Sequence, residues 1–277
     1  MLKVFENSRR VAFFAGALLL AACSHDAGSS PSTEGGSGTS ASSDGPSIHY
    51  DQVSVMTVDG VPQEEHAYQD QQDACQKSGL PMHALSPAEV GKLGRIHVEA
   101  WIGPDRQARH TEEWHENVGK PCQFVLDHKD STQIDEASGR STLVDNTTQQ
   151  AEVQELGPQE PAAAVAANDG AMDDAAKQAG WSKLADASAN GASCAVWRDP
   201  VGTEVCMWSG GGKWGYTSYG VNSPRDGVSG GETIVLWVHP GKGAAWRLQT
   251  QTFNVGQPLD DRVFQMPGGV AVHKASP

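Results

Sequence analysis

Polar and apolar positions alternate with a period of two residues over two long parts of the chain. The first part runs from Arg95 to about Asp145, and turn sequences interrupt it at Gly103-Pro104-Asp105 and at 117–121. Successive side chains of a strand point to opposite faces, so this pattern predicts an antiparallel meander. We expect its strands at 95–102, 106–116, 122–128, 131–135 and 140–144.

The second alternating part begins at Ser193. The segment Ile234-Val235-Leu236-Trp237-Val238 is apolar at every position. A strand of this kind is covered on both faces, so we expect it at the centre of a sheet. The strands predicted for this part lie at 193–198, 203–208, 213–219, 232–239, 244–253 and 262–266.

Helical signals are few. Residues 62–77 are polar, lack glycine and precede Gly79, which is typical of a surface helix with a glycine C-cap. Ser86-Pro87-Ala88-Glu89 is a capping box that starts a short helix. Residues 147–191 are rich in Ala and Gln and predict two or three short helices. The sequence therefore predicts an α+β fold, mainly antiparallel sheet, in one domain at 48–277 with a helical insert at about 147–191.

The N-terminus has the layout of an export signal. A basic head with Lys3, Arg9 and Arg10 precedes an apolar run from Val11 to Ala22. These 12 residues are too few for a membrane-spanning helix, which needs about 20. The run ends in Leu20-Ala21-Ala22-Cys23, which resembles the lipobox of bacterial lipoproteins. The resemblance implies that residues 1–22 are a cleaved signal peptide and that Cys23 carries diacylglycerol and an N-acyl chain such as palmitate. An ordinary secreted protein with a spare thiol at Cys23 is the alternative.

Residues 23–47 are expected to form a flexible tether. Ser24 to Ser47 contains 9 Ser and 5 Gly with no apolar periodicity, so nothing offsets the entropy of ordering it. Such a chain spans roughly 25–30 Å. In Gram-negative lipoproteins an Asp after the lipidated Cys favours the inner membrane. Ser24 stands there in this chain, so the resemblance implies the periplasmic face of the outer membrane, or the outside of the cell membrane in a Gram-positive host.

The charge limits the partners. The formal net charge of the 277-residue chain is −14, and loss of Lys3, Arg9, Arg10 and Glu6 with the signal removes a net +2, which leaves about −16. An acidic protein without a basic patch has no electrostatic reason to bind nucleic acid. The expected partners are the membrane, through the acyl chains on Cys23, and an envelope protein or an apolar ligand.

The other four cysteines suggest two disulfides, as suits an oxidising compartment. Asp199-Pro200-Val201-Gly202 is a strong turn, and folding the chain there brings Cys194 and Cys206 almost opposite each other. Such a bridge contributes about 3 kcal/mol. Cys75 and Cys122 then pair by elimination. The spacing C-x-x-C does not occur, which argues against a four-cysteine metal site.

Three motifs suggest chemistry, and each has a simpler explanation. Gly227-Val228-Ser229-Gly230-Gly231 matches the G-x-S-x-G form, but it lacks the strand-to-helix elbow of hydrolases. His110-Thr111-Glu112-Glu113-Trp114-His115-Glu116 collects metal-binding side chains, with His110, Glu112 and Glu116 on one strand face. A metal site would need further ligands from elsewhere, so we interpret this segment as an exposed polar strand. The loop 209–215 fails the phosphate-loop spacing. We therefore assign no catalytic residue, metal or cofactor.

The C-terminal part carries one further resemblance. Five of the eight tryptophans, at 197, 208, 214, 237 and 246, fall in the predicted C-terminal strands and are interpreted as core. Residues 232–270 end in Leu259-Asp260-Asp261-Arg262-Val263-Phe264-Gln265-Met266-Pro267-Gly268 and resemble the closing strands of periplasmic lipoprotein-carrier (LolA/LolB-like) half-barrels. That family wraps a curved antiparallel sheet around helices and can hold acyl chains. The cysteine pairs and the Ala/Gln-rich insert depart from it.

These expectations together favour a membrane-anchored envelope lipoprotein that acts as a non-enzymatic binding or assembly module. The alternative is a lipid-tethered serine hydrolase that uses Ser229.

Overall fold

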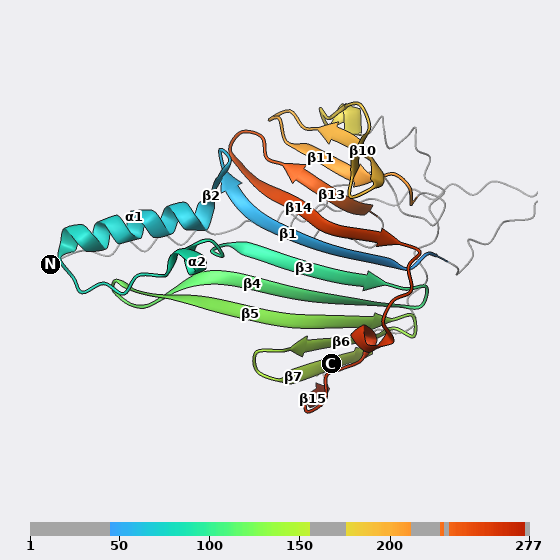
Figure 1. Cartoon of the computed structure of the whole chain (residues 1–277), viewed down its shortest axis with the longest axis horizontal. Helices are drawn as coiled ribbons and strands as arrows, with labels where there is room; N and C mark the ends of the chain where they lie inside the picture. Colours follow the sequence, from blue (N-terminus) through green and yellow to red (C-terminus); the bar gives the residue numbers. More distant parts are fainter. Residues whose placement is uncertain (1–44, 156–175, 212–227, 230–232, 275–277) are drawn as a thin grey trace, which may run out of the picture. The chain divides into compact units, whose positions relative to one another are not determined.

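The computed structural model describes residues 45–155, 176–211, 228–229 and 233–274. Fifteen strands in these ranges form one open sheet. Figure 1 shows most of its main path, from β15 to β10. The strands are β1 (Ile48–Val58), β2 (Val61–Pro62), β3 (Arg95–Ile102), β4 (Arg106–Lys120), β5 (Gln123–Glu136), β6 (Arg140–Asp145), β7 (Gln150–Glu155), β8 (Ser182–Lys183), β9 (Ala187–Ala189), β10 (Ala192–Arg198), β11 (Glu204–Trp208), β12 (Val228–Ser229), β13 (Thr233–His239), β14 (Ala244–Val255) and β15 (Ala271–Lys274).

The strand order shows how distant parts of the chain meet. The main path of the sheet is β15-β7-β6-β5-β4-β3-β1-β14-β13-β11-β10-β8. Pairing is antiparallel except between β15 and β7. The N-terminal strand β1 lies between β3 and β14, so it joins the two alternating parts of the sequence. The predicted α+β class with mainly antiparallel sheet is confirmed.

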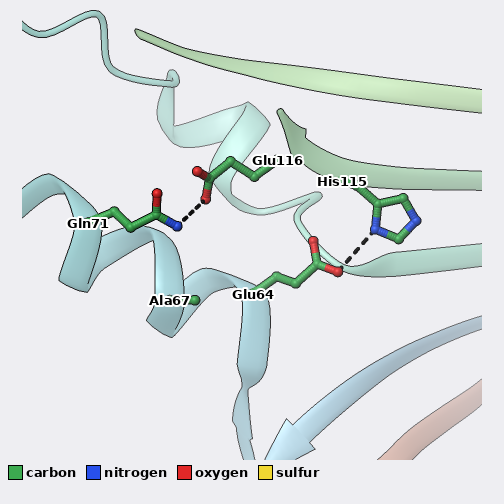
Figure 2. Close-up of a pocket in the computed structure, with 5 residues that line it drawn as sticks. All are labelled: Glu64, Ala67, Gln71, His115 and Glu116. Atoms are coloured by element: carbon green, nitrogen blue, oxygen red, sulfur yellow. Dashed lines mark hydrogen bonds and ion pairs between the residues drawn. The ribbon is translucent and has the colours of Figure 1, made fainter. Parts of the chain in front are cut away.

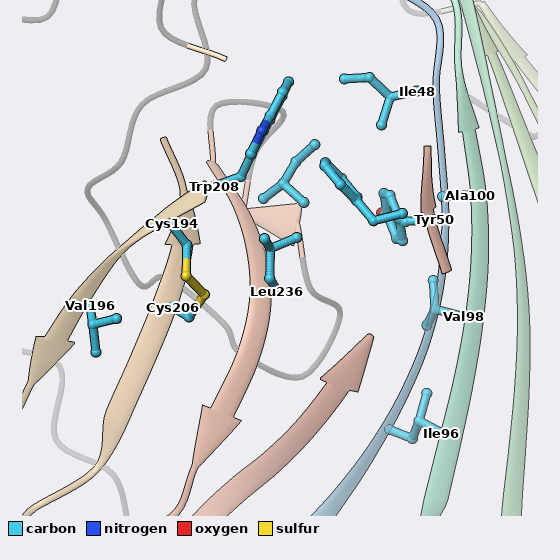
Figure 3. Packing of buried hydrophobic residues seen from close by; sticks show 12 residues of the cluster. Ile48, Tyr50, Ile96, Val98, Ala100, Cys194, Val196, Cys206, Trp208 and Leu236 are labelled. Carbon is cyan, nitrogen blue, oxygen red and sulfur yellow. A yellow bond between two sulfur atoms is a disulfide. The ribbon is translucent and has the colours of Figure 1, made fainter. Parts of the chain in front are cut away.

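The main core lies between two parts of this one sheet. One side of β1 and β3 faces the side of β10, β11 and β13 that carries the Cys194–Cys206 disulfide, and Tyr50, Val98 and Leu236 pack between them (Figure 3). A second cluster around Trp197, Met207 and Leu248 fills the other face of β10, β11, β13 and β14. The strand at 234–238 is buried along most of its length, as its sequence predicts.

The helices pack in a separate cluster. Helix α1 (Gln63–Ser78) ends at Gly79, whose φ of 69° is left-handed and therefore suits glycine. Helix α2 (Pro87–Val90) starts at the predicted capping box of Ser86 and Glu89. Tyr68 of α1 contacts Phe124 edge-to-face, and both join a third cluster with the Cys75–Cys122 disulfide. The lipoprotein-carrier resemblance implies helices inside the curve of the sheet, whereas α1 and α2 pack outside the main core.

Among the described helices, none has the length and apolar character that a bilayer crossing requires.

Both predicted disulfides are present, with Cα–Cα distances of 5.7 Å for Cys75–Cys122 and 5.4 Å for Cys194–Cys206. Cys194 and Cys206 lie almost opposite each other, as predicted. Cys206 lies opposite Val196, and the bridge runs diagonally across the hairpin. The reason is that Thr203 also belongs to the loop, because its carbonyl accepts the Asp199 N–H.

Three predictions need correction. The turn expected at 117–121 is part of β4, which continues to Lys120. The segment expected as a strand at 262–266 contains a 3-10 helix, η2 (Asp261–Phe264), capped by the Asp260 side chain. The helical insert at 147–191 is wrong where β7, β8 and β9 occur, because these residues find pairing partners in the sheet. Residues 156–175 of that insert, and the strand expected at 213–219, lie outside the described part.

Candidate functional site

Four neighbouring strands place histidines and carboxylates on one face of the sheet. The strands are β5, β4, β3 and β1, in that order. Their registers place Asp51 opposite Glu99 and Glu99 opposite His110, and His97 opposite Glu112 and Glu112 opposite Asp130. We call this surface the histidine–carboxylate face; it comprises His49, Asp51, His97, Glu99, His110, Glu112, His128 and Asp130.

The period of the strands explains why these groups share one face. On β1 and β3 the intervening residues, such as Tyr50 and Val98, are buried in the main core. The alternate positions must then point away from that core. The polar side chains remain partly exposed, with 24% of Glu112 and 41% of His128 accessible. Ligands in solution can therefore reach them.

A chain of hydrogen bonds runs across all four strands. His97 Nε2 lies 2.9 Å from Asp51 Oδ1, and His97 Nδ1 lies 2.9 Å from Glu112 Oε2. The other oxygen of Glu112, Oε1, lies 3.0 Å from His128 Nε2. Glu112 thus bridges two histidines, one on β3 and one on β5.

Two further pairs flank this chain. His110 Nε2 lies 2.7 Å from Asp130 Oδ1, and Asn146 Nδ2 donates to the same oxygen at 2.7 Å. His49 Nε2 lies 2.8 Å from Glu99 Oε1. Each histidine of the face therefore contacts at least one carboxylate.

The network shifts the pKa of its central members. Burial lowers the pKa of His97, but the hydrogen bonds and negative charges of Glu112 and Asp51 outweigh it, so the net shift is upward. Burial raises the pKa of Glu112, and the hydrogen bonds and charges of its histidine neighbours, His97 first among them, turn the net shift downward. Both shifts favour an imidazolium between two carboxylates.

Two tryptophans border the face. The His128 ring stacks on Trp114 with centroids 5.1 Å apart and planes 8° from parallel. At the other end His49 stacks on Trp101 with centroids 5.5 Å apart. Lys92 Nζ lies 5.3 Å from the Trp114 ring centroid. Stacking holds each imidazole in one plane and so fixes the direction of its ring nitrogens.

A polar pocket of about 390 Å³ lies between α1 and β4 (Figure 2). It is lined by Glu64, Ala67, Gln71, His115 and Glu116. His115 Nδ1 lies 3.0 Å from Glu64 Oε1, and Gln71 donates to Glu116 Oε2 at 3.2 Å. Burial is the main cause that raises the pKa of Glu116, and the charge of Glu64 adds to it. The pocket thus holds two separate pairs, His115 with Glu64 and Gln71 with Glu116.

The structure divides the predicted strand motif at 110–116 between two sites. His110 and Glu112 join the histidine–carboxylate face, whereas His115 and Glu116 line the pocket by α1. The next strand, β5, places His128 and Asp130 beside Glu112. Ser229 lies in β12 opposite Thr233 of β13. Cys23 and the glycines that flank Ser229 in its motif lie outside the described residues.

Sequence reasoning missed β1 with His49 and Asp51, and it did not connect His97, His128 and Asp130 to a site. The signal for β1 was only partial: Ile48 to Asp51 alternate between apolar and polar, but Gln52 and Ser54 then occupy buried positions. The prediction that five tryptophans belong to the core can be checked for four of them. Trp197 and Trp208 are buried, and Trp237 and Trp246 pack against the main core. Trp214 lies outside the described residues.

Comparisons with known proteins add little. No protein-family model matches the chain, and no curated protein sequence matches it significantly. The chain is similar in structure to an uncharacterized conserved protein from Thermus thermophilus, with a TM-score of 0.35 and 6% sequence identity. That similarity covers 84% of this chain and 91% of the other.

Proposed function

We propose that this protein is a membrane-tethered lipoprotein of the bacterial envelope that acts as a non-enzymatic binding module. The observation that carries the binding role is the histidine–carboxylate face: four histidines and four carboxylates, partly exposed and arranged across four strands. The sequence Leu20-Ala21-Ala22-Cys23 supports the anchor, and the Ser/Gly-rich residues after it support a tether.

The chemistry of the face favours binding over catalysis. Its eight residues supply nitrogen and oxygen donors but no hydroxyl or thiol that could serve as a nucleophile. A serine or cysteine hydrolase pairs such a nucleophile with a base. Here the histidines pair with carboxylates instead, which holds their donor atoms at fixed positions. Fixed, partly desolvated donor atoms are what an ion or a polar ligand requires.

The two disulfides agree with an exported protein, because such bridges persist in oxidising compartments. The placement we propose is the periplasmic face of the outer membrane, with Ser24 after the lipidated cysteine as its sequence basis. In a Gram-positive host the same anchor places the domain outside the cell membrane.

Metabolic labelling with a palmitate analogue tests the anchor. We expect labelled wild-type protein in the membrane fraction, no label in Cys23→Ser, and full label in the matched control Ser24→Ala. Ser24→Asp should move the protein towards the inner membrane of a Gram-negative host. Unlabelled wild-type protein released into the periplasm would contradict the anchor.

Labelling with a serine-reactive fluorophosphonate tests the non-enzymatic role. We expect no label on Ser229. Label that is present in the wild type and lost in Ser229→Ala would favour the serine-hydrolase alternative instead.

A further inference from the structure

We propose that Glu112, His128 and Asp130 form a binding site for one divalent transition-metal ion of the first row, for which Zn²⁺ is a suitable probe. The inference rests on the binding role proposed for the histidine–carboxylate face and names its ligand class. It does not depend on the lipid anchor.

The three side chains already lie close enough to share an ion. Glu112 and Asp130 are direct register partners on β4 and β5, and His128 is two residues before Asp130 on the same face. One donor atom from each lies within 4.8 Å of the other two. A tetrahedral ion with bonds of about 2.0–2.1 Å needs donor atoms roughly 3.3–3.4 Å apart. His128 Nε2 and Glu112 Oε1, at 3.0 Å, are near that separation.

The donor set selects the class of ion. Two carboxylates carry a charge of −2, which a divalent cation neutralises. Calcium and magnesium prefer sites built from oxygen alone, whereas an imidazole nitrogen favours zinc and its first-row neighbours. Three protein ligands leave a coordination position for water. The site is therefore expected to prefer Zn²⁺, Co²⁺ or Ni²⁺ over Ca²⁺.

The surrounding residues orient each of the three donors, as the supporting shell of a metal site does. His97 contacts Glu112 through Oε2 and leaves Oε1 directed at His128. His110 and Asn146 both contact Oδ1 of Asp130. The Trp114 ring stacks on His128 and fixes its plane.

The position also allows an ion to enter. The accessible fractions of the side chains are 24% for Glu112, 26% for Asp130 and 41% for His128. The site is thus open to solvent on one side and supported by the sheet on the other. This combination distinguishes it from the exposed pair His66–Asp70 of α1, which the described residues leave without a third donor.

Isothermal titration calorimetry with ZnCl₂ tests the proposal. The protein is the untagged full mature chain with Cys23→Ser, treated with chelator and kept oxidised. We expect one Zn²⁺ per chain. His128→Gln, Glu112→Gln and Asp130→Asn should each weaken binding by about 100-fold or more, and His97→Gln by roughly 10–100-fold, as supporting residues do. His66→Gln, the matched control, should bind like the wild type.

Absorption of the Co²⁺-loaded protein gives a second readout. We expect a d–d band of a four- or five-coordinate ion that His128→Gln abolishes, while near-UV circular dichroism shows that the variant remains folded. Three results would overturn the site: no Zn²⁺ binding, equal binding in His128→Gln, or Ca²⁺ binding as tight as Zn²⁺ binding. A negative result in these metal-binding tests would leave the palmitate labelling of Cys23 unaffected. The metal site and the lipid anchor can therefore be refuted separately.

Discussion

At the scale of single residues, two carboxylates show how the surroundings set a charge. Glu116 Oε1 is buried and has no hydrogen-bond partner among the described residues, whereas Oε2 accepts from Gln71. Burial therefore raises the pKa of Glu116. Asp145 Oδ1 accepts from the backbone N–H groups of Thr147 and Thr148 in the turn before β7, and these bonds lower its pKa. The contributions of Glu116 and Asp145 to the stability of the fold should therefore change with pH in opposite directions.

We predict that Glu116→Gln stabilises the protein at pH 7 by up to about 0.5 kcal/mol, because it removes a half-buried charge whose Oε1 has no hydrogen-bond partner among the described residues. A raised folded-state pKa means that Glu116 favours the fold below the unfolded pKa near 4.5 and loses this contribution as the pH rises through the folded pKa. The advantage of the variant should therefore disappear at pH 4. Urea unfolding of the variant and the wild type at pH 7 and pH 4 measures this difference in the free energy of unfolding.

Asp145→Asn is the control with the opposite sign. Because the pKa of Asp145 is lowered in the folded state, its carboxylate stabilises the fold above the unfolded pKa of 3.8. This contribution is lost as the pH falls through the folded pKa. This variant should be less stable than the wild type at pH 7, with a smaller difference at low pH. If the stability difference from the wild type changed with pH in the same way for both variants, the opposite pKa shifts of Glu116 and Asp145 would be contradicted.

At the scale of elements, loop length decides register. The β10–β11 hairpin has a five-residue loop from Asp199 to Thr203, in which Asp199 Oδ1 accepts from the N–H groups of Val201 and Thr203. This loop puts Cys206 opposite Val196, and the disulfide then joins diagonal neighbours on the buried face. The bridge closes a short loop in the centre of the main core.

We predict that Cys206→Ser lowers the free energy of unfolding by about 2–4 kcal/mol, because the unfolded chain regains the entropy of the opened loop. A single free thiol should appear, at Cys194. Thermal unfolding and thiol titration measure the two effects. Non-reducing peptide mapping of the wild type is the control: a peptide that links Cys75 to Cys194 would contradict the pairing.

At the scale of the whole molecule, the folded domain is one sheet from Ile48 to Lys274, and the described chain reaches it through Ser47. The carbonyl of Ser47 accepts from Gly256 N–H at 2.7 Å, and its hydroxyl donates to the Gln257 carbonyl. Ser47, just before β1, is thus tied to the two residues that follow β14. Residues further upstream have the composition of a linker, so their removal should leave the domain intact.

We predict that deletion of residues 31–45 leaves the melting temperature within about 1 °C of the wild type, since a linker without native contacts contributes nothing to the folded state. Differential scanning calorimetry of both proteins, each with Cys23→Ser, measures this. Ser47→Pro is a contrasting variant that should lower the melting temperature by disturbing the entry to β1. A loss of several degrees on deletion would show that the segment packs on the domain.

The sequence by itself determined the local features. The glycine cap at Gly79, the capping box at Ser86 and the alternation of β3 each depend on residues a few positions apart, so backbone propensity and side-chain period suffice to predict them. The covered strand at 234–238 and both cysteine pairs could also be predicted from the sequence. Half of the histidine–carboxylate face was visible in the same way, as polar positions on the strands near His97 and His110.

Only the tertiary structure decided which of these positions meet. With the turn expected at 117–121, Glu112 would lie opposite Leu126. The strands instead continue to a turn at Pro121 and Cys122, which shifts the register by four residues and places Asp130 opposite Glu112. Likewise β1 lies between β3 and the distant strand β14, and this placement brings Asp51 to His97. Register between strands is set by packing and turn geometry together, and these act over distances that no local sequence pattern encodes.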